Sequence, residues 1–123
     1  MKSNNPISDE INPVSSDELY EMANFYPRTT GLPMTVWVGP RGNARHDVRI
    51  KVHMNHGDRM TIENTAVVGV RPDPHIIEGR LPASDQRAVF DWITLNAAAI
   101  TAYWDGNIDT LELVQMLKPL APP

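Results

Sequence analysis

The chain has 123 residues, the size of a single domain. Hydrophobic residues make up 41% and charged residues 21%, so the composition predicts a packed core and excludes an intrinsically disordered chain. Cysteine is absent, which excludes disulfides, thiolate metal sites and cysteine nucleophiles. No apolar run approaches the roughly 20 residues of a membrane span, and the start of the chain has no signal peptide. We therefore expect a cytoplasmic protein.

The net charge of −4 is unevenly distributed along the chain. Residues 1–24 carry one basic and five acidic side chains, residues 25–59 carry six basic and two acidic, and residues 60–123 carry four basic and eight acidic. A basic middle thus lies between two acidic flanks. Since opposite charges attract, this pattern raises the hypothesis that the acidic N-terminal residues mask the basic middle, within the chain or on a neighbouring molecule.

The first residues predict little regular structure. Residues 1–14 are polar and interrupted by two prolines, so we expect a flexible N-terminal segment followed by one α+β domain over residues 15–120. Ser15 and Glu18 have the spacing of a capping box and predict a short helix. Pro27 should end it, because proline forces the residue before it out of helical geometry.

The middle of the chain predicts a sheet with strands at residues 34–38, 48–54, 59–63 and 66–70. The second of these is the clearest, because its apolar and polar residues alternate. Val48, Ile50, Val52 and Met54 should face the core, and the residues between them should face solvent. Residues 55–58, Asn-His-Gly-Asp, are typical of a tight hairpin leading into residues 59–63.

The C-terminal third predicts two helices. Ser84 is a candidate N-cap for the first, and Asp105-Gly106 supplies its end. One apolar stripe at helical spacing runs along it: Val89, Trp92, Ile93, Ala97 and Ile100. Asp109 and Glu112 predict a capping box for a second helix that buries Leu111 and Val114. The expected fold class is α+β, with an antiparallel sheet of three to four strands and two to three helices packed on one face.

Several short motifs occur in a recognisable order: Gly31-Leu32, a strand from His46 to Val52, Ile77-Glu78-Gly79-Arg80-Leu81-Pro82, Trp92-Ile93, Trp104 and Lys118-Pro119-Leu120. Over about residues 31–120 this order resembles a family of small bacterial α+β proteins classed as a domain of unknown function, often encoded beside toxin–antitoxin-type genes. Of the Pro-Pro-His-x-His segment common in that family, only His46 is kept. The resemblance implies the fold class, a bacterial origin and a regulatory context, and it implies no activity.

The basic middle supplies the candidate binding residues. Arg49, Lys51 and His53 alternate on the outward side of one strand. Basic residues of the neighbouring strand and loop complete the candidate set: Arg41, Arg45, Arg49, Lys51, His53 and Arg59. Such a face fits an acidic protein partner first and a nucleic acid second. The alternative interpretation is an ordinary solvated face, because outward strand positions must be polar.

Histidines raise a different interpretation. His46, His53 and His56, together with Asp47 or Asp58, are the residue types of a zinc or manganese site, which a metal-assisted hydrolase or nuclease would use. Their spacing matches no metal signature, and His46 and His53 are seven residues apart, so on one unbroken strand they would face opposite sides.

From the sequence we therefore expect a binding or regulatory module that presents its basic sheet face to an acidic macromolecule, without a cofactor, a metal or catalytic residues. The alternatives are the metal-assisted enzyme and a structural homodimer, for which Trp104 is a candidate anchor.

Overall fold

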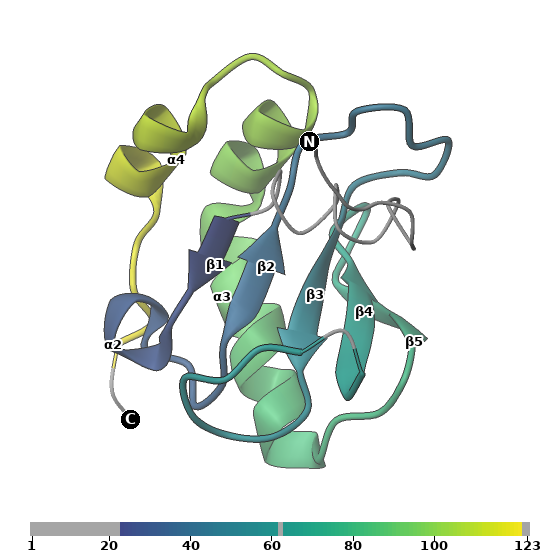
Figure 1. Cartoon of the computed structure of the whole chain (residues 1–123), viewed down its shortest axis with the longest axis vertical. Coiled ribbons are helices and arrows are strands. Elements are labelled where there is room, and N and C mark those ends of the chain that lie inside the picture. The colour runs from purple at the N-terminus through teal and green to yellow at the C-terminus, as the bar shows by residue number, and fades with distance from the viewer. Residues whose placement is uncertain (1–22, 62, 122–123) are drawn as a thin grey trace, which may run out of the picture.

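The computed structural model describes residues 23–61 and 63–121. The flexible segment and the first part of the helix predicted from Ser15 fall outside these residues. The predicted end of that helix was wrong, because Ala23–Phe25 form a strand and Pro27 begins a helix. Within the described part, five strands form one antiparallel sheet in the order β1-β2-β3-β4-β5 (Figure 1). The strands and helices are β1 (Ala23–Phe25), α2 (Pro27–Thr30), β2 (Val36–Val38), β3 (Arg49–His53), β4 (Thr65–Gly69), β5 (His75–Glu78), α3 (Ala83–Trp104) and α4 (Thr110–Met116).

The predicted α+β class is confirmed, but the predicted strand count was wrong, since the described residues contain five strands rather than three to four. Residues 59–61 and 63 form no strand. β3 pairs instead with β4, in the register Ile50 opposite Val68 and Lys51 opposite Val67. β4 is apolar on both of its sides, which suits a strand with a neighbour on each edge. The two strands that the sequence did not indicate, β1 and β5, are three and four residues long and lie at the edges.

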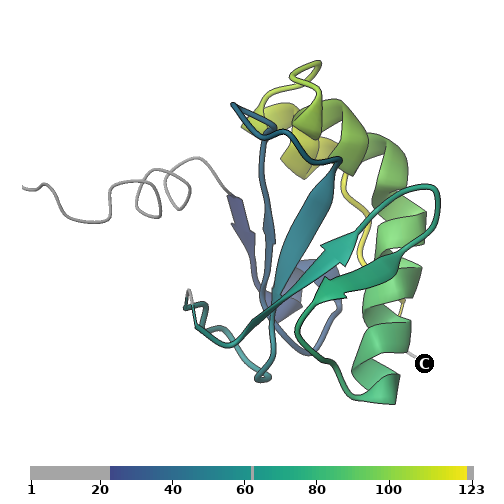
Figure 2. The same ribbon diagram turned by 90° about the vertical axis from the view of Figure 1, so that its right-hand side faces the viewer.

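One face of the sheet packs on α3, which crosses behind the strands in Figure 1 and runs along one side of them in Figure 2. The predicted alternation of β3 is confirmed for Ile50 and Val52, both fully buried. The core between sheet and helix contains Val36, Val38, Ile50, Val52 and Val68 from the strands and Val89, Trp92, Ile93 and Ile100 from α3. Each such side chain contributes about 1.5–3 kcal/mol by leaving water, so this layer fixes the position of the sheet.

The ends of the helices follow the sequence in part. α3 begins after Pro82, two residues earlier than an N-cap at Ser84 requires, so that prediction was wrong. Its end at Trp104 before Asp105-Gly106 is as predicted, and Gly106 has a φ of 79°. The capping box of α4 is confirmed. Glu112 N–H donates to Asp109 Oδ1 and Asp109 N–H donates to Glu112 Oε1, both at 2.9 Å.

α4 turns a different side to the core than the sequence indicated. Leu113 is fully buried, whereas Leu111 is 65% and Val114 48% exposed. The helix is seven residues long, and Tyr103 of α3 contacts it through a hydroxyl 2.7 Å from Thr110 Oγ1. This contact with α3 helps to fix which side of α4 faces the core. Two or three apolar residues in so short a helix are too few to predict that side. None of the helices in residues 23–61 and 63–121 combines the length and apolarity that crossing a bilayer requires.

Candidate functional site

The face of the sheet turned away from α3 is the candidate site. We call it the open face and define it by Trp37, Arg49, Lys51 and Val67. Successive side chains of a strand point to opposite sides, so Trp37, between the core residues Val36 and Val38, lies on the open face. Trp37, Lys51 and Val67 are direct neighbours across β2, β3 and β4. In Figures 1 and 2, neither α3 nor α4 lies over this side.

The open face combines apolar and basic groups. Trp37 and Val67 are 3% and 7% exposed, and Arg49 and Lys51 are half-buried. The row ends at Asn24 on β1 and at Glu78 on β5. Both side chains are exposed; Asn24 is uncharged and Glu78 is acidic. The positive charge is therefore concentrated at the middle strand, beside the tryptophan.

Two N–H donors of this face have no acceptor. Trp37 Nε1 and Arg49 Nε are both buried, and neither makes a hydrogen bond in the described part of the chain. A buried donor without an acceptor costs about 1–3 kcal/mol, so proteins rarely leave one unmatched. Trp92 Nε1, in the core on the other side of the sheet, also lacks an acceptor, so an unmatched donor alone does not mark a binding face. Trp37 Nε1 and Arg49 Nε differ from it in lying on adjacent strands of the side that faces away from α3.

The other predicted binding residues are not gathered on the open face. Arg41 and Arg45 lie in the β2–β3 connection at one end of the sheet, and Arg59 lies in the β3–β4 connection, which leaves the other end of β3 (Figure 1). Arg41 Nε donates to the Ala44 carbonyl at 3.1 Å, and its backbone N–H donates to the Trp104 carbonyl at 3.0 Å. These arginines are exposed and can attract an acidic ligand from a distance without contacting the two donors.

His53 was expected to face solvent, and this was wrong. It is 3% exposed, because its ring bonds within the β3–β4 connection. Nδ1 lies 3.1 Å from the Asn55 carbonyl oxygen and Nε2 lies 3.2 Å from Thr61 Oγ1. His53 therefore holds the connection that follows β3 and is removed from the set that a partner can reach.

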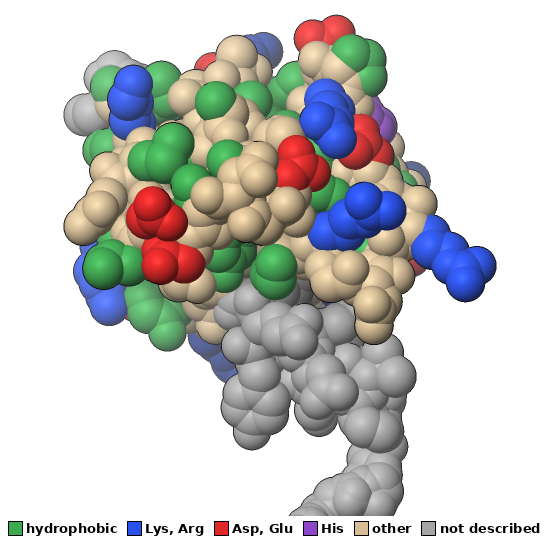
Figure 3. Space-filling view, turned by 90° about the horizontal axis from the view of Figure 1, so that it is seen from above, with side chains coloured by type: hydrophobic (Ala, Val, Ile, Leu, Met, Phe, Trp, Pro, Cys, Tyr) green, Lys and Arg blue, Asp and Glu red, His purple; other side chains and the backbone are tan. Residues whose placement is uncertain are grey.

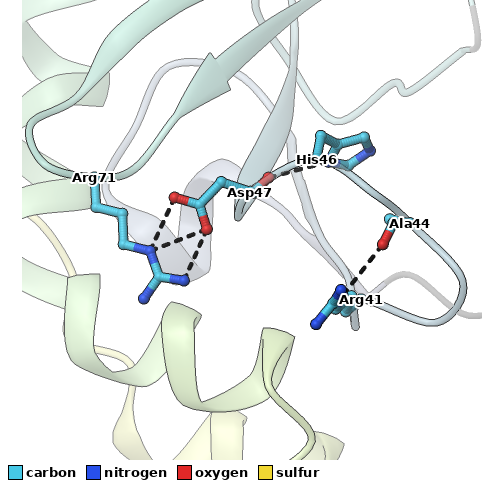
Figure 4. A network of polar contacts seen from close by, with 5 residues as sticks. All are labelled: Arg41, Ala44, His46, Asp47 and Arg71. Carbon is cyan, nitrogen blue, oxygen red and sulfur yellow. Dashed lines mark hydrogen bonds and ion pairs between the residues drawn. The ribbon is translucent and has the colours of Figure 1, made fainter.

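His46 and Asp47, two of the candidate metal ligands, are adjacent in sequence but make separate side-chain contacts (Figure 4). Arg71 donates to Asp47 through Nη2 at 2.7 Å and through Nε at 2.9 and 3.0 Å. The hydrogen bonds from Arg71 lower the pKa of Asp47 to about 2. The His46 ring instead lies 5.3 Å from the Trp104 ring, centroid to centroid. Arg71 gave no signal in the sequence, because its partner is 24 residues away.

The metal-site alternative finds no geometric support. His56 Nε2 bonds the carboxylate of Asp85 in the first turn of α3 at 2.9 and 3.1 Å, and both ring nitrogens of His53 contact oxygens within its own connection. In residues 23–61 and 63–121, no three His, Asp or Glu side chains come together as a metal ion would need. His46, His53 and His56 thus have three separate environments.

Figure 3 views the end of the molecule that carries the β2–β3 and α3–α4 connections. Basic and acidic side chains are interspersed there, with hydrophobic groups between them, so this end presents no uninterrupted basic patch.

Comparisons of the chain with protein-family models, with curated proteins and with solved structures gave no match. The family resemblance over residues 31–120 therefore stays a prediction.

Proposed function

We propose that this protein is a small binding module whose open face takes an acidic segment of a protein partner. One observation carries the proposal: the buried donors Trp37 Nε1 and Arg49 Nε lack acceptors on the face that also carries Lys51. Carboxylate and carbonyl oxygens of a partner would satisfy these donors, and hydrogen bonds to charged groups are the stronger ones. Side chains around the two donors must shift slightly to admit the partner's oxygens.

A protein segment fits this face better than a nucleic acid does. Binding of single strands depends on several exposed aromatic rings for base stacking, whereas Trp37 is 3% exposed. The chain carries a net charge of −4, which opposes a long phosphate backbone.

The test is a pull-down with the full chain from a lysate of the organism that encodes it. Wild type is compared with Arg49→Glu/Lys51→Glu, which reverses the charge of the open face. The matched control is Arg80→Glu/Arg87→Glu, which makes the same charge change at two exposed positions away from that face. We expect an acidic protein that wild type and control retain, that the face variant loses, and that salt releases.

Equal eluates from wild type and the face variant would contradict the proposal, provided that circular dichroism shows the variant to be folded. If wild type retains a nucleic acid that the face variant loses, the partner is a nucleic acid rather than a protein.

The structural homodimer is a separate alternative. β1 and β5 are the edges of the described sheet, and an exposed edge strand is a common pairing surface. Its test is the mass of the full chain in solution, measured by light scattering across protein concentrations. A monomer at all concentrations would leave the open face as the candidate interface.

A further inference from the structure

The outward side of α4 carries exposed apolar side chains. Among the described residues, five large hydrophobic side chains are exposed, and three of them lie in this one helix of seven residues: Leu111 at 65%, Val114 at 48% and Met116 at 44%. Exposed hydrophobic residues are common when they are scattered singly, whereas a group of them marks an interaction site. This inference concerns a different surface from the open face and is independent of the binding proposed there.

The geometry of a helix brings these side chains together. Leu111 and Val114 are three positions apart, and Glu112 and Met116 are four apart, so each pair lies on neighbouring turns of one side. Leu113 points instead into the core and is the buried residue of the helix. The outward side therefore carries Leu111, Glu112, Val114 and Met116, which we call the α4 surface.

α4 is fixed in place although it buries little of its own surface. A helix of seven residues is too short to be stable alone, since isolated helices need about 12–15 residues. The capping box holds its first turn, and Leu113 anchors it in the core. The Tyr103 hydroxyl, 2.7 Å from Thr110 Oγ1, ties it to α3. The helix thus presents its apolar side chains on a fixed frame, which lowers the entropy cost of binding.

The charge of this part of the chain is acidic. Residues 88–117 contain four carboxylates and no lysine, arginine or histidine. Two of these, Asp109 and Glu112, are exposed at the start of α4. Each cap bond uses one oxygen of its carboxylate, and the second oxygen of each can accept from a cation. In Figure 3, acidic side chains lie among hydrophobic ones on the left, the side of α4 in Figure 1.

The nearest other charges along the chain lie away from these two carboxylates. Asp47 and, more weakly, Asp105 raise the pKa of Arg71, so the charge of Asp105 acts at the other end of the α3–α4 connection. Lys118 follows α4, and Asn96 of α3 binds its backbone N–H at 2.8 Å and its carbonyl at 3.0 Å. The carboxylates stand at the first turn and Lys118 beyond the last, roughly 10 Å further along the helix axis.

We propose that the α4 surface docks a basic amphipathic helix of a partner protein. The partner's apolar side chains, spaced three or four positions apart, pack on Leu111, Val114 and Met116. Its lysine or arginine side chains bind the carboxylates of Asp109 and Glu112 at the rim of the contact. Charge selects this occupant: the surface repels nucleic acids and anionic membranes, and a symmetric contact with a second copy would bring like carboxylates together.

The probe is a synthetic amphipathic helix of about 15 leucine and lysine residues, the length at which an isolated helix begins to be stable. Its binding to the full chain is measured by fluorescence anisotropy, beside a peptide in which glutamate replaces lysine. We expect the leucine–lysine peptide to bind and the leucine–glutamate peptide to bind roughly tenfold more weakly or worse, because its charge has the wrong sign.

Apolar variants test the contact itself. Leu111→Gln and Leu111→Gln/Val114→Gln remove one and two exposed apolar side chains, and glutamine favours a helix at least as well as valine does. The affinity for the leucine–lysine peptide should fall roughly tenfold or more in the double variant. The matched control is Ile77→Gln, an exposed apolar side chain on β5, which should keep the wild-type affinity.

Charge variants test the rim. Asp109→Asn/Glu112→Gln removes both charges and keeps the capping box, because asparagine caps a helix as well as aspartate does and glutamine can replace glutamate in the box. The affinity should fall several-fold in low salt, and the difference should vanish in high salt, where charges are screened. Glu78→Gln/Asp91→Asn removes two exposed carboxylates elsewhere and should have less effect.

The open-face variant Arg49→Glu/Lys51→Glu should not weaken this binding, so the two proposals fail separately. With each variant shown to be folded by circular dichroism, equal affinities of wild type and Leu111→Gln/Val114→Gln would overturn the proposal, as would an equal loss in Ile77→Gln. Light scattering that shows a dimer of the full chain, dissociated by Leu111→Gln/Val114→Gln, would also overturn it, since the α4 surface would then hold a second copy.

Discussion

The α3 side of the sheet and the open face are built from alternate residues of the same strands. On the α3 side, Val38, Ile50 and Val68 form a row of fully buried aliphatic side chains. On the open face, the corresponding row is Trp37, Lys51 and Val67, which combines an indole with an ammonium group. Both sides contain a buried indole N–H without an acceptor, Trp92 in the core and Trp37 on the open face, but the open face adds the charged groups of Arg49 and Lys51. The first side thus supplies the core, and the second is the side on which the proposed binding would take place.

The largest expected effect on stability comes from replacing the adjacent valines of β4 with alanine. Val68→Ala removes two methyl groups from the α3 side and should lower the free energy of unfolding by about 2 kcal/mol, from lost burial and the cavity left behind. Val67→Ala makes the same change on the open face and should cost less, because Val67 is 7% exposed and lies outside the core against α3. Urea unfolding of both variants measures the difference, and equal losses would remove the distinction between the two faces.

Removing the acidic N-terminal residues tests the masking hypothesis. Residues 1–22 carry one basic and five acidic side chains, so their deletion brings the net charge from −4 to zero. If they compete for the open face, the affinity for an acidic partner should rise by several-fold in low salt, since attraction between opposite charges is screened by ions. The measurement is binding at two salt concentrations, with the deletion in the Arg49→Glu/Lys51→Glu background as control. An unchanged affinity would argue against masking.

Arg49→Met should separate stability from binding. The methionine keeps most of the apolar stem and removes the buried Nε donor that lacks an acceptor, so the free protein should be unchanged or more stable by up to about 1 kcal/mol. Binding of the partner should weaken at the same time. Tyr103→Phe is the control in the opposite sense, because its hydroxyl has a partner in Thr110 and its loss should cost about 1 kcal/mol. A destabilised Arg49→Met would show that the donor is satisfied in the free protein.

The ion pair of Asp47 and Arg71 gives the smallest expected effect, because both side chains are about half exposed. The pKa of Asp47 is lowered from 3.8 to about 2, so the pair stabilises the fold above pH 4 and this contribution is lost as the pH falls towards 2. Asp47→Asn should therefore show a smaller loss of stability than wild type between pH 5 and pH 2.5, measured as the urea midpoint. Parallel pH curves for the two proteins would contradict this.

How much the sequence predicts depends on how local each feature is. The alternation of β3, the apolar stripe of α3 and the capping box of α4 all act between residues at most four positions apart. They are confirmed at Ile50 and Val52, at Val89, Trp92, Ile93 and Ile100, and at Asp109 and Glu112. Arg49 and Lys51 lie on the side that alternation predicts. His53 follows the same alternation yet is buried, because a loop eight residues further on bonds its ring.

The candidate site was predictable in part for the same reason. Trp37 lies between two valines that face the core, so the alternation of side chains along a strand places Trp37 on the open face. Its pairing with Lys51 and Val67 depends on strand register, which the sequence misassigned when it predicted a hairpin into residues 59–63. β3 pairs instead with β4, in which Ala66, Val67 and Val68 are buried.

The sequence by itself thus determined the fold class, the long helix and the face on which Arg49 and Lys51 lie, because periodicity and capping are local chemistry. Only the tertiary structure decided the edge strands, the salt bridge between Asp47 and Arg71 and the contact between His56 and Asp85. These contacts join residues 24 and 29 positions apart, and their partners are selected by the burial of the whole sheet against α3 rather than by any pattern along the chain.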